Sequence, residues 1–405
     1  MKKNLFLFVL LSFASQAQEN PIERLKKHIE YLASDELAGR GAGTDGEKKA
    51  AGYLVQYYEK LGLAPLATHP DYFQTFTAKK GLHPFETTVS TQNVMAFLDN
   101  QATNTVVIGA HYDHLGTDGQ GASLAGQTNN TIHNGADDNA SGTAGVLELA
   151  HYLTKNDVKE KYNYLFVHFA AEELGLVGSK QFTQNPPIPL SSIHYMLNMD
   201  MIGRYTVDKG LTVGGVGTSP YWGYAVPESM KKTSLRIQVD STGMGPSDHA
   251  SFYLQNIPVL SFFTGVHTDY HKPSDDADKI NYVGQEQVLG FIKEIISRME
   301  KVDKAPFTAT AVPQMMSAQS SFKVTMGVIP DYSYAKKGLR LDGVTEGRPA
   351  AKAGIKTNDV LIQLGDKTIA DIQDYMEALG QFEKGQTVKA IVLRNGKPVE
   401  LSVTF

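Results

Sequence analysis

The sequence contains no cysteine, and this absence limits how the chain can be stabilised. Without thiols, neither a disulfide framework nor a lipid-modified N-terminal cysteine is possible, so the fold must depend on ordinary hydrophobic cores. A strong excess of one charge is also missing, because 38 basic residues oppose 43 acidic ones and leave a net charge of -5. This mild acidity argues against a surface for nucleic acid or anionic lipid.

Long apolar runs are missing as well, except at the N-terminus. There Lys2 and Lys3 precede an apolar run, and small residues at 15–17 follow it. This order is typical of a secretory signal peptide, and the run is shorter than the ~20 residues of a membrane span. We therefore expect a signal peptide at 1–17 and export to the periplasm or the medium; the alternative is an uncleaved N-terminal anchor.

A change in composition divides the rest of the chain. Residues 301–321 contain two prolines, many small residues and no sustained apolar period, which is typical of a linker. Before this segment, apolar runs alternate with helical patterns; after it come short strands, glycine turns and two helical segments. We predict one domain at 18–304, a linker at 305–321 and a second domain at 322–405.

The first domain is predicted to be α/β, with a mostly parallel central sheet flanked by helices. Five continuous apolar runs are typical of buried strands: 105–110, 164–171, 195–198, 211–213 and 258–263. A helical pattern at 144–153 lies between the first two. Continuous apolar strands alternating with helices indicate a parallel sheet covered on both faces, and sites in such sheets form beyond the carboxyl ends of the strands.

Polar side chains follow these strands where each one ends, and another acidic cluster lies in the loop before 144–153. The clusters are His111 with Asp113, Asp137 with Asp138, Glu172 with Glu173, Asp200, and His271 at the end of 265–271. Taken singly, each has an ordinary explanation as a surface histidine, a turn or a helix start. Five clusters on one edge, however, would repel one another unless cations neutralised them.

The residue types at this edge indicate which cation is involved. Imidazole mixed with carboxylate, without thiolate, favours zinc, leaves manganese or cobalt as alternatives and disfavours calcium. The number of acids indicates two ions. The remaining histidines near these motifs are interpreted as hydrogen-bonded surface residues: His114, His133, His249 and His267.

The order of these motifs resembles the two-zinc aminopeptidases of the bacterial leucyl aminopeptidase and aminopeptidase Y type, from about Leu32 to about Gln287. The resemblance implies a zinc exopeptidase fold, two Zn²⁺ ions and peptide substrates with a free N-terminus. It also implies the metal ligands: Asp137 would bridge both ions, His111 and Asp200 would complete one site, and Glu173 and His271 the other.

Further roles are implied by the same resemblance. Glu172 would be the catalytic base that activates a water between the two ions. Asp113 would orient His111, and Asp275 would do the same for His271. The peptide bond between Asp137 and Asp138 would be cis.

Two features depart from the family pattern. Cysteines that some members carry near the substrate pocket are absent, and the loop 243–249 takes their place. Met244 stands where some members have an active-site tyrosine, which removes one donor to the substrate carbonyl. The insertion that forms a protease-associated domain in some relatives is also absent between 63 and 106.

Three other functions stay open at this point. A glutaminyl cyclase on the same fold would bind one zinc ion, so a metal count would separate it. A carboxypeptidase would hold the substrate carboxylate with basic residues and would release residues from the other end. A non-catalytic binding module would tolerate the loss of ligands, and no ligand motif is lost here.

The last segment, 322–405, resembles a PDZ domain of the bacterial protease-associated kind. The resemblance depends on the sequences PAAKAG at 349–354 and NDVL at 358–361, which occur in the expected order. It implies a small β-rich domain that binds the C-terminus of a peptide through the loop containing Met326, Gly327 and Val328. The alternative is a PDZ fold that only packs against the first domain.

Overall fold

The computed structural model describes residues 20–80, 87–119, 122–125, 131–310, 324–330, 337–344, 347–370 and 372–405. The predicted signal peptide at 1–17 lies outside the described residues. Within the described part of the chain, no helix combines the length and the apolar character needed to cross a membrane.

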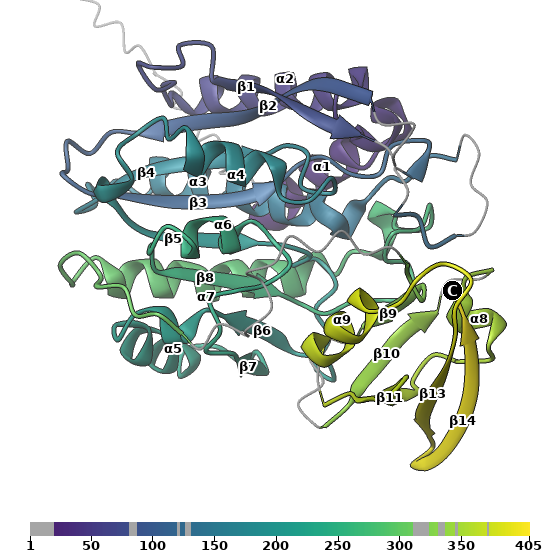
Figure 1. Cartoon of the computed structure of the whole chain (residues 1–405). Coiled ribbons are helices and arrows are strands. Elements are labelled where there is room, and N and C mark those ends of the chain that lie inside the picture. The colour runs from purple at the N-terminus through teal and green to yellow at the C-terminus, as the bar shows by residue number, and fades with distance from the viewer. Residues whose placement is uncertain are drawn as a thin grey trace, which may run out of the picture.

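An eight-stranded sheet forms the centre of the first domain, in the order β1-β2-β4-β3-β5-β8-β6-β7 (Figure 1). Its strands are β1 (Phe73–Lys80), β2 (Thr87–Leu98), β3 (Thr105–His111), β4 (Asn163–Phe169), β5 (Ile193–Met199), β6 (Leu211–Gly214), β7 (Ile237–Val239) and β8 (Val259–Phe263). The four central strands, β4-β3-β5-β8, are parallel to one another. The predicted mostly parallel sheet is therefore confirmed, and the antiparallel pair β1–β2 extends it at one side.

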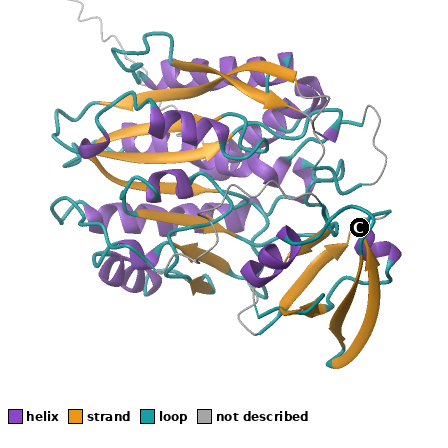
Figure 2. Ribbon diagram, in the orientation of Figure 1, coloured by secondary structure: helices purple, strands orange, loops and turns teal. Residues whose placement is uncertain are grey.

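The central strands are apolar because both faces of the sheet are covered. Every residue of β3, β4 and β5 is buried, which explains why their sequences show no alternation of polar and apolar positions. Helices lie on the two faces (Figure 2). They are α1 (Pro21–Leu32), α2 (Asp45–Leu61), α3 (Gly142–Lys155), α4 (Val177–Gln184), α5 (Trp222–Met230), α6 (His249–Tyr253) and α7 (Tyr282–Met299).

Two hydrophobic cores result from this arrangement. The larger one packs α1, α2, α3, α5 and α7 against one face of the sheet, with Leu54, Leu147 and Leu289 among its buried residues. The smaller one packs α4 and α6 against the other face through Phe182 and Phe252. The four central strands run in one direction between these layers, so their carboxyl ends meet at a single edge. The parallel pair β6–β7 runs the opposite way.

The second domain has its own core and an antiparallel sheet in the order β14-β13-β11-β10-β9, with β12 beside β11. The strands are β9 (Val328–Pro330), β10 (Leu339–Val344), β11 (Val360–Leu364), β12 (Lys367–Thr368), β13 (Thr387–Arg394) and β14 (Lys397–Thr404), with helices α8 (Pro349–Lys352) and α9 (Ile372–Gly380). The predicted small β-rich domain is confirmed. A pair of hydrogen bonds from Arg394 to the buried Asp359 ties β13 to the turn before β11.

The structure corrects the start of the predicted linker. Residues 305–310 bind the α/β domain through backbone hydrogen bonds: Ala305 N–H donates to His194 Nδ1 (2.9 Å), and Thr308 N–H donates to the Thr218 carbonyl (2.8 Å). Thr310 N–H donates to the hydroxyl of Tyr253 (3.0 Å). These six residues belong to the packed α/β domain, and the rest of the predicted linker, from 311 on, lies outside the described residues.

Candidate metal centre

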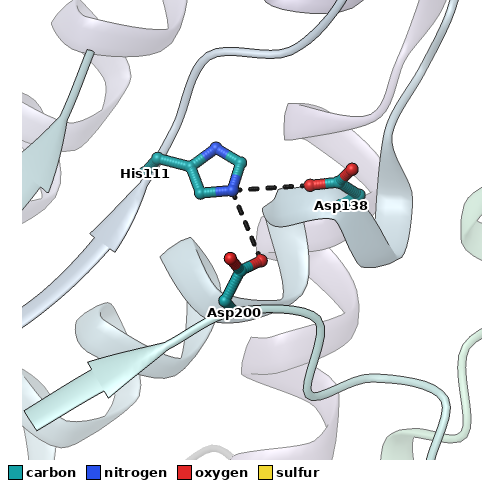
Figure 3. A group of neighbouring side chains, drawn as sticks. All are labelled: His111, Asp138 and Asp200. Carbon is teal, nitrogen blue, oxygen red and sulfur yellow. Dashed lines mark hydrogen bonds and ion pairs between the residues drawn. The ribbon is translucent and has the colours of Figure 1, made fainter. Parts of the chain in front are cut away.

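A first group of possible metal ligands lies at the carboxyl ends of β3 and β5. His111 is the last residue of β3, and Asp200 directly follows β5. His111 Nε2 is 3.4 Å from an oxygen of Asp200 and 3.4 Å from Oδ1 of Asp138. The three side chains point toward one another, with Asp138 entering from the turn at Ala136–Ser141 (Figure 3).

A second group shares Asp138 with the first. His271 Nε2 lies 3.2 Å from Oδ2 of Asp138 and 3.2 Å from Oε2 of Glu173, which follows β4. His114 Nδ1 lies 2.7 Å from the other oxygen, Oε1, of Glu173. Asp138 thus presents Oδ1 to one group and Oδ2 to the other. The seven side chains at this edge form the Asp138 cluster: His111, His114, Asp138, Glu172, Glu173, Asp200 and His271.

Asp138 therefore takes the place that was predicted for Asp137. The one cis peptide bond recorded in the described residues joins Asp138 to Asn139, not Asp137 to Asp138, so that prediction is also wrong. The turn has non-helical dihedral angles at Asp138 and Asn139. The carboxylate of Asp138 faces the histidines, and the carboxylate of Asp137 is held elsewhere.

Asp137 belongs to a separate buried network beside the turn. Its Oδ1 accepts the N–H of Gly203 (2.7 Å), and its Oδ2 lies 3.1 Å from Nε2 of His267. Asp275 accepts the backbone N–H groups of both Asp137 and Asp138 with one oxygen (3.0 Å each). Arg204 pairs with Asp269 at 3.2 Å and lies 3.9 Å from Asp275. We call these five residues the Asp137 cluster: Asp137, Arg204, His267, Asp269 and Asp275.

The spacing within the Asp138 cluster fits zinc. Two ligands bound tetrahedrally at about 2.0–2.1 Å lie about 3.3 Å apart. The four contacts that His111 and His271 make with Asp138, Asp200 and Glu173 measure 3.2–3.4 Å. Imidazole and carboxylate are also the donor types that zinc accepts. The residues therefore fit zinc, and the carboxylate of Asp138 faces both groups of possible ligands.

The charges of this cluster are unbalanced in the protein alone. Burial opposes protonation of His111, but Glu172 and Asp200 raise its pKa well above the usual value. His271 shows the same competition, with Glu173 and Asp138 as the acids that raise its pKa. Among the described residues, no lysine or arginine forms an ion pair with the four carboxylates of the cluster. This acid-rich set of side chains favours the binding of a cation.

Glu172 lies beside the first group at the end of β4. Its Oε2 is 4.0 Å from His111 Nε2, and its side chain is 11 % exposed. Burial raises the pKa of Glu172 well above its usual value, and His111 acts against this shift. Its position leaves it next to the candidate ligands and in limited contact with solvent.

The orienting role of Asp113 stays a prediction, whereas His271 does not contact the carboxylate of Asp275 as predicted. Asp113 Oδ1 accepts the N–H of Glu172 (3.0 Å) and lies 3.9 Å from Nδ1 of His111, which is nearer to the backbone carbonyl of Asp113 at 3.2 Å. Nδ1 of His271 is 3.1 Å from the carbonyl oxygen of Ala122 rather than bound to Asp275. The carboxylate of Asp113 thus fixes the backbone that carries Glu172, and the far nitrogens of both histidines face backbone carbonyls.

Arg40 was missed as a site residue. Its buried guanidinium donates to the carbonyls of Tyr112 (2.8 Å), Asn134 (2.6 Å), Gly135 (3.0 Å) and Leu32. Burial lowers its pKa to about 10, so the group stays charged at neutral pH. Arg40 joins the loop after β3 to the turn that carries Asp138. Every residue has a backbone carbonyl, so a side chain that binds four carbonyls cannot be recognised from the residue types in the sequence.

The interpretation of the other histidines as surface residues was wrong for three of them. His114, His133 and His249 are buried, and His267 is half-buried against Asp137. Met244, in the loop 243–249, is buried in the smaller core beside Tyr253. Asp248 of the same loop is also buried, and burial raises its pKa to about 7.

A mostly parallel α/β sheet with two His-carboxylate groups at its carboxyl edge fits a metal-dependent hydrolase as the class of protein. The model of peptidase family M28 matches residues 93–295, half of the chain, and the chain belongs to this family. A PDZ domain model matches residues 322–405. The resemblance drawn from the motifs is confirmed for both parts.

The chain is similar in sequence to several curated proteins. Leupeptin-inactivating enzyme 1 of Streptomyces exfoliatus is 28% identical over 266 residues, which cover 64% of this chain and 52% of that protein. Aminopeptidase YwaD of Bacillus subtilis is 30% identical over 201 residues, which cover 46% of this chain and 42% of that protein. The chain thus spans about half the length of the curated relatives it matches.

Solved structures with the same fold include both peptidases and cyclases. BSAP, a zinc aminopeptidase from Bacillus subtilis, has a TM-score of 0.53 and 18% identity, and covers 72% of this chain and 98% of its own. A glutaminyl cyclase from Bacteroides thetaiotaomicron has a TM-score of 0.55 and 17% identity, and covers 68% of this chain and 97% of its own. At this identity the likeness shows the fold alone.

Proposed function

We propose that this protein is an exported zinc aminopeptidase that removes the N-terminal residue of peptides. The observation that carries the proposal is the position of Asp138, whose two oxygens face two separate groups of ligands at zinc-like spacings. One carboxylate between two groups fits a pair of ions. The relative named aminopeptidase YwaD supports peptide hydrolysis as the reaction.

Two zinc ions, when bound, would polarise the scissile carbonyl and acidify a water molecule. Glu172 is placed to accept a proton there, because its carboxylate lies 4.0 Å from His111 but outside both groups of possible ligands. Burial raises the pKa of Glu172 well above its usual value, which makes the carboxylate a stronger proton acceptor. Asp113 supports this role by holding the N–H of Glu172.

The acidic character of the edge also supports recognition of a free α-amine. Four carboxylates lie around the site, so an ammonium group on the substrate is attracted, and a blocked amine loses this interaction. We expect amino-acid p-nitroanilides to be cleaved and their N-acetyl forms to be poor substrates. Equal rates for the free and acetylated forms would contradict the amine-dependent part of the proposal.

A glutaminyl cyclase is the second candidate, because cyclases share the fold at a TM-score of 0.55. The first group, His111, Asp138 and Asp200, is complete in this chain, which supports two ions over one. A peptide with N-terminal glutamine separates the two functions by mass spectrometry. Loss of the glutamine residue indicates an aminopeptidase, whereas loss of ammonia with the residue retained indicates a cyclase.

Export is part of the proposal and depends on the N-terminal sequence. The basic, apolar and small-residue order of 1–17 supports cleavage after Ala17. N-terminal sequencing of the protein recovered outside the cytoplasm should begin at Gln18. Recovery in the cytoplasm with the first residues intact would contradict export.

For the PDZ domain we propose binding of a peptide C-terminus beside β9. This strand pairs only with β10 among the described strands, so its other edge can accept a peptide strand. Met326 packs in the core with its carbonyl bound by Ala350 N–H, so it supports the loop rather than offering its side chain. Calorimetry with peptides ending in a free carboxylate should show binding that the amidated peptides lack.

A further inference from the structure

His114 lies directly behind Glu173 in the Asp138 cluster. Its side chain is fully buried, and its Nδ1 lies 2.7 Å from Oε1 of Glu173 and 3.9 Å from Oδ2 of Asp138. His271 approaches the other oxygen of the same carboxylate, because its Nε2 lies 3.2 Å from Oε2. Each oxygen of Glu173 therefore has its own histidine neighbour.

The two distances have different chemical meanings. Two ligands of one zinc ion lie about 3.3 Å apart when the bonds are about 2.0–2.1 Å and tetrahedral. The His271 to Oε2 distance matches this spacing, as do the contacts of His111. The His114 to Oε1 distance of 2.7 Å is instead that of a charge-assisted N–H···O hydrogen bond. His114 thus has the geometry of a donor to a ligand, and His271 that of a ligand.

The surroundings of His114 hold its ring in this orientation. The N–H of His114 donates to the carbonyl of Arg40 (3.2 Å), which fixes the backbone. Gly135 has a φ of +58° and packs on the ring: a Cβ at this position would lie 2.5 Å from Cδ2 of His114. The backbone at 135 therefore lies close against the ring, and a side chain there would displace it.

We propose that His114 is a positioning residue that donates its Nδ1–H to Oε1 of Glu173, so that only Oε2 is presented to a zinc ion. This inference rests on the proposed zinc centre. It adds His114 as a residue that sets the zinc affinity of the second group, which contains Glu173 and His271. A hydrogen bond to one oxygen disfavours rotation of the carboxylate and the binding of an ion through both oxygens. Groups that orient a ligand in this way typically contribute about 10- to 100-fold to metal affinity.

The test uses three substitutions of His114 in the full chain, with zinc affinity measured by competition with a chromogenic chelator. In His114→Asn the amide nitrogen takes the place of Nδ1 and can still donate to Oε1, whereas His114→Gln extends past it and His114→Ala has no donor. We expect the Ala and Gln variants to bind one of two zinc ions about 10- to 100-fold more weakly. The Asn variant should bind both ions close to wild type.

Matched controls come from His194, a buried histidine at the start of β5, away from the carboxyl edge. His194→Ala and His194→Asn remove a buried imidazole in the same way, and both should retain wild-type affinity for both ions. Circular dichroism then shows whether each variant is folded. A loss of affinity in these controls equal to that in His114→Ala would reduce the effect to general destabilisation and overturn the proposal.

Two other results would overturn it. Unchanged zinc affinity in His114→Ala would show that the hydrogen bond does not matter, and equal losses in the Asn and Ala variants would make His114 a ligand. Cadmium-113 NMR of the wild-type protein decides the second point without any variant: the imidazoles of His111 and His271 should couple to cadmium, and that of His114 should not. If the wild-type protein binds no zinc or cadmium, the proposed function fails; two bound ions with an unaffected His114→Ala variant would sink only this inference.

Discussion

Two clusters of buried acids and histidines lie on either side of one turn, and they are built differently. In the Asp137 cluster, protein donors serve most of the carboxylate oxygens: Gly203 N–H, two further backbone N–H groups, Arg204, and Lys279 at 2.7 Å from Asp269. The exception is Oδ1 of Asp275, which accepts no hydrogen bond from the described residues and lies 3.9 Å from Arg204. In the Asp138 cluster, the ion-pair partners of the four carboxylates within the described part of the chain are histidines. Adjacent residues of the same type therefore have different electrostatic surroundings.

The difference shows which acidic cluster needs a cation. A buried carboxylate is stable when amide, guanidinium or ammonium donors surround it, and such a cluster is complete without metal. Asp138 and Asp200 instead face imidazoles at 3.2–3.4 Å, which is the spacing of two ligands of one zinc ion. Both clusters contain carboxylates and histidines. They differ in which protein groups donate hydrogen bonds to the carboxylates.

The largest expected effect distinguishes the two aspartates directly. Asp138→Asn removes the carboxylate shared by both groups, so zinc affinity at both positions should fall by more than about 100-fold, beyond the usual effect of an orienting residue. Asp137→Asn should keep both ions, because its carboxylate faces Gly203 and His267 instead. The measurement is zinc content after dialysis.

The Asp137 variant has its own expected cost. Weakening its buried hydrogen bonds should lower the free energy of unfolding by about 1–3 kcal/mol in urea titrations of the metal-free protein. If Asp137→Asn lost zinc and Asp138→Asn retained it, the assignment of the shared carboxylate to Asp138 would be reversed.

The next largest effect separates the adjacent acids Glu172 and Glu173. Glu172→Gln should keep both zinc ions while kcat falls by about 10²- to 10⁴-fold, because a proton acceptor is removed but no ligand is. Glu173→Gln should lose zinc from one position. Steady-state kinetics together with a zinc count on the same samples checks both variants, and a fully active Glu172→Gln would show that another group takes the proton.

A smaller effect concerns the support behind the metal edge. Arg40→Met keeps much of the side-chain volume but leaves four carbonyls without their donor, so the free energy of unfolding should fall by about 3–5 kcal/mol. Arg40→Lys keeps the charge but has fewer hydrogen-bond donors. Its free energy of unfolding should lie between those of Arg40→Met and the wild type. Urea titrations measure both, and equal stability of Arg40→Met and wild type would show that the contacts of Arg40 do not hold the loops together.

The smallest expected effect comes from comparing the pKa of a histidine in the Asp138 cluster with that of His168, a histidine in the core. Carboxylates raise the pKa of His111, whereas burial lowers the pKa of His168 to about 3. Because the folded-state pKa of His168 is depressed below 6.5, its contribution to stability is present above pH 6.5 and is lost as the pH falls toward 3. At pH 5 the loss should be about 2 kcal/mol relative to pH 8.

His168→Asn removes this titrating group and should reduce the pH dependence of the unfolding free energy by that amount. Urea titrations at pH 8 and pH 5 provide the comparison. An identical pH dependence in the variant and the wild type would show that His168 does not titrate over this range in the folded protein.

The sequence was sufficient to predict five of the eight strands and the edge that carries the site, for a physical reason. Strands buried on both faces must be apolar throughout, so polar residues can follow only where the strands end, and His111, Glu173 and Asp200 lie there. Family motifs added the ligand order. The antiparallel strand β1 alternates buried and exposed positions along most of its length and was not marked in advance.

The other features of the site depend on where side chains point in the folded chain. The periodicity of the sequence gives no information about this. Asp137 and Asp138 are adjacent in an irregular turn, and the path of the backbone decides which carboxylate faces the histidines. Arg40 binds carbonyls, which every residue has, and His114 acts through a carboxylate distant in the sequence. Neither interaction changes the pattern of residue types along the chain.

The most direct test of the central claim is a zinc titration of the metal-free wild-type protein, followed by native mass spectrometry. If Asp138 serves two groups of ligands, the titration should end at two zinc ions per chain, and no third ion should bind at the Asp137 cluster. A titration that ends at one ion, or at none, would contradict the account.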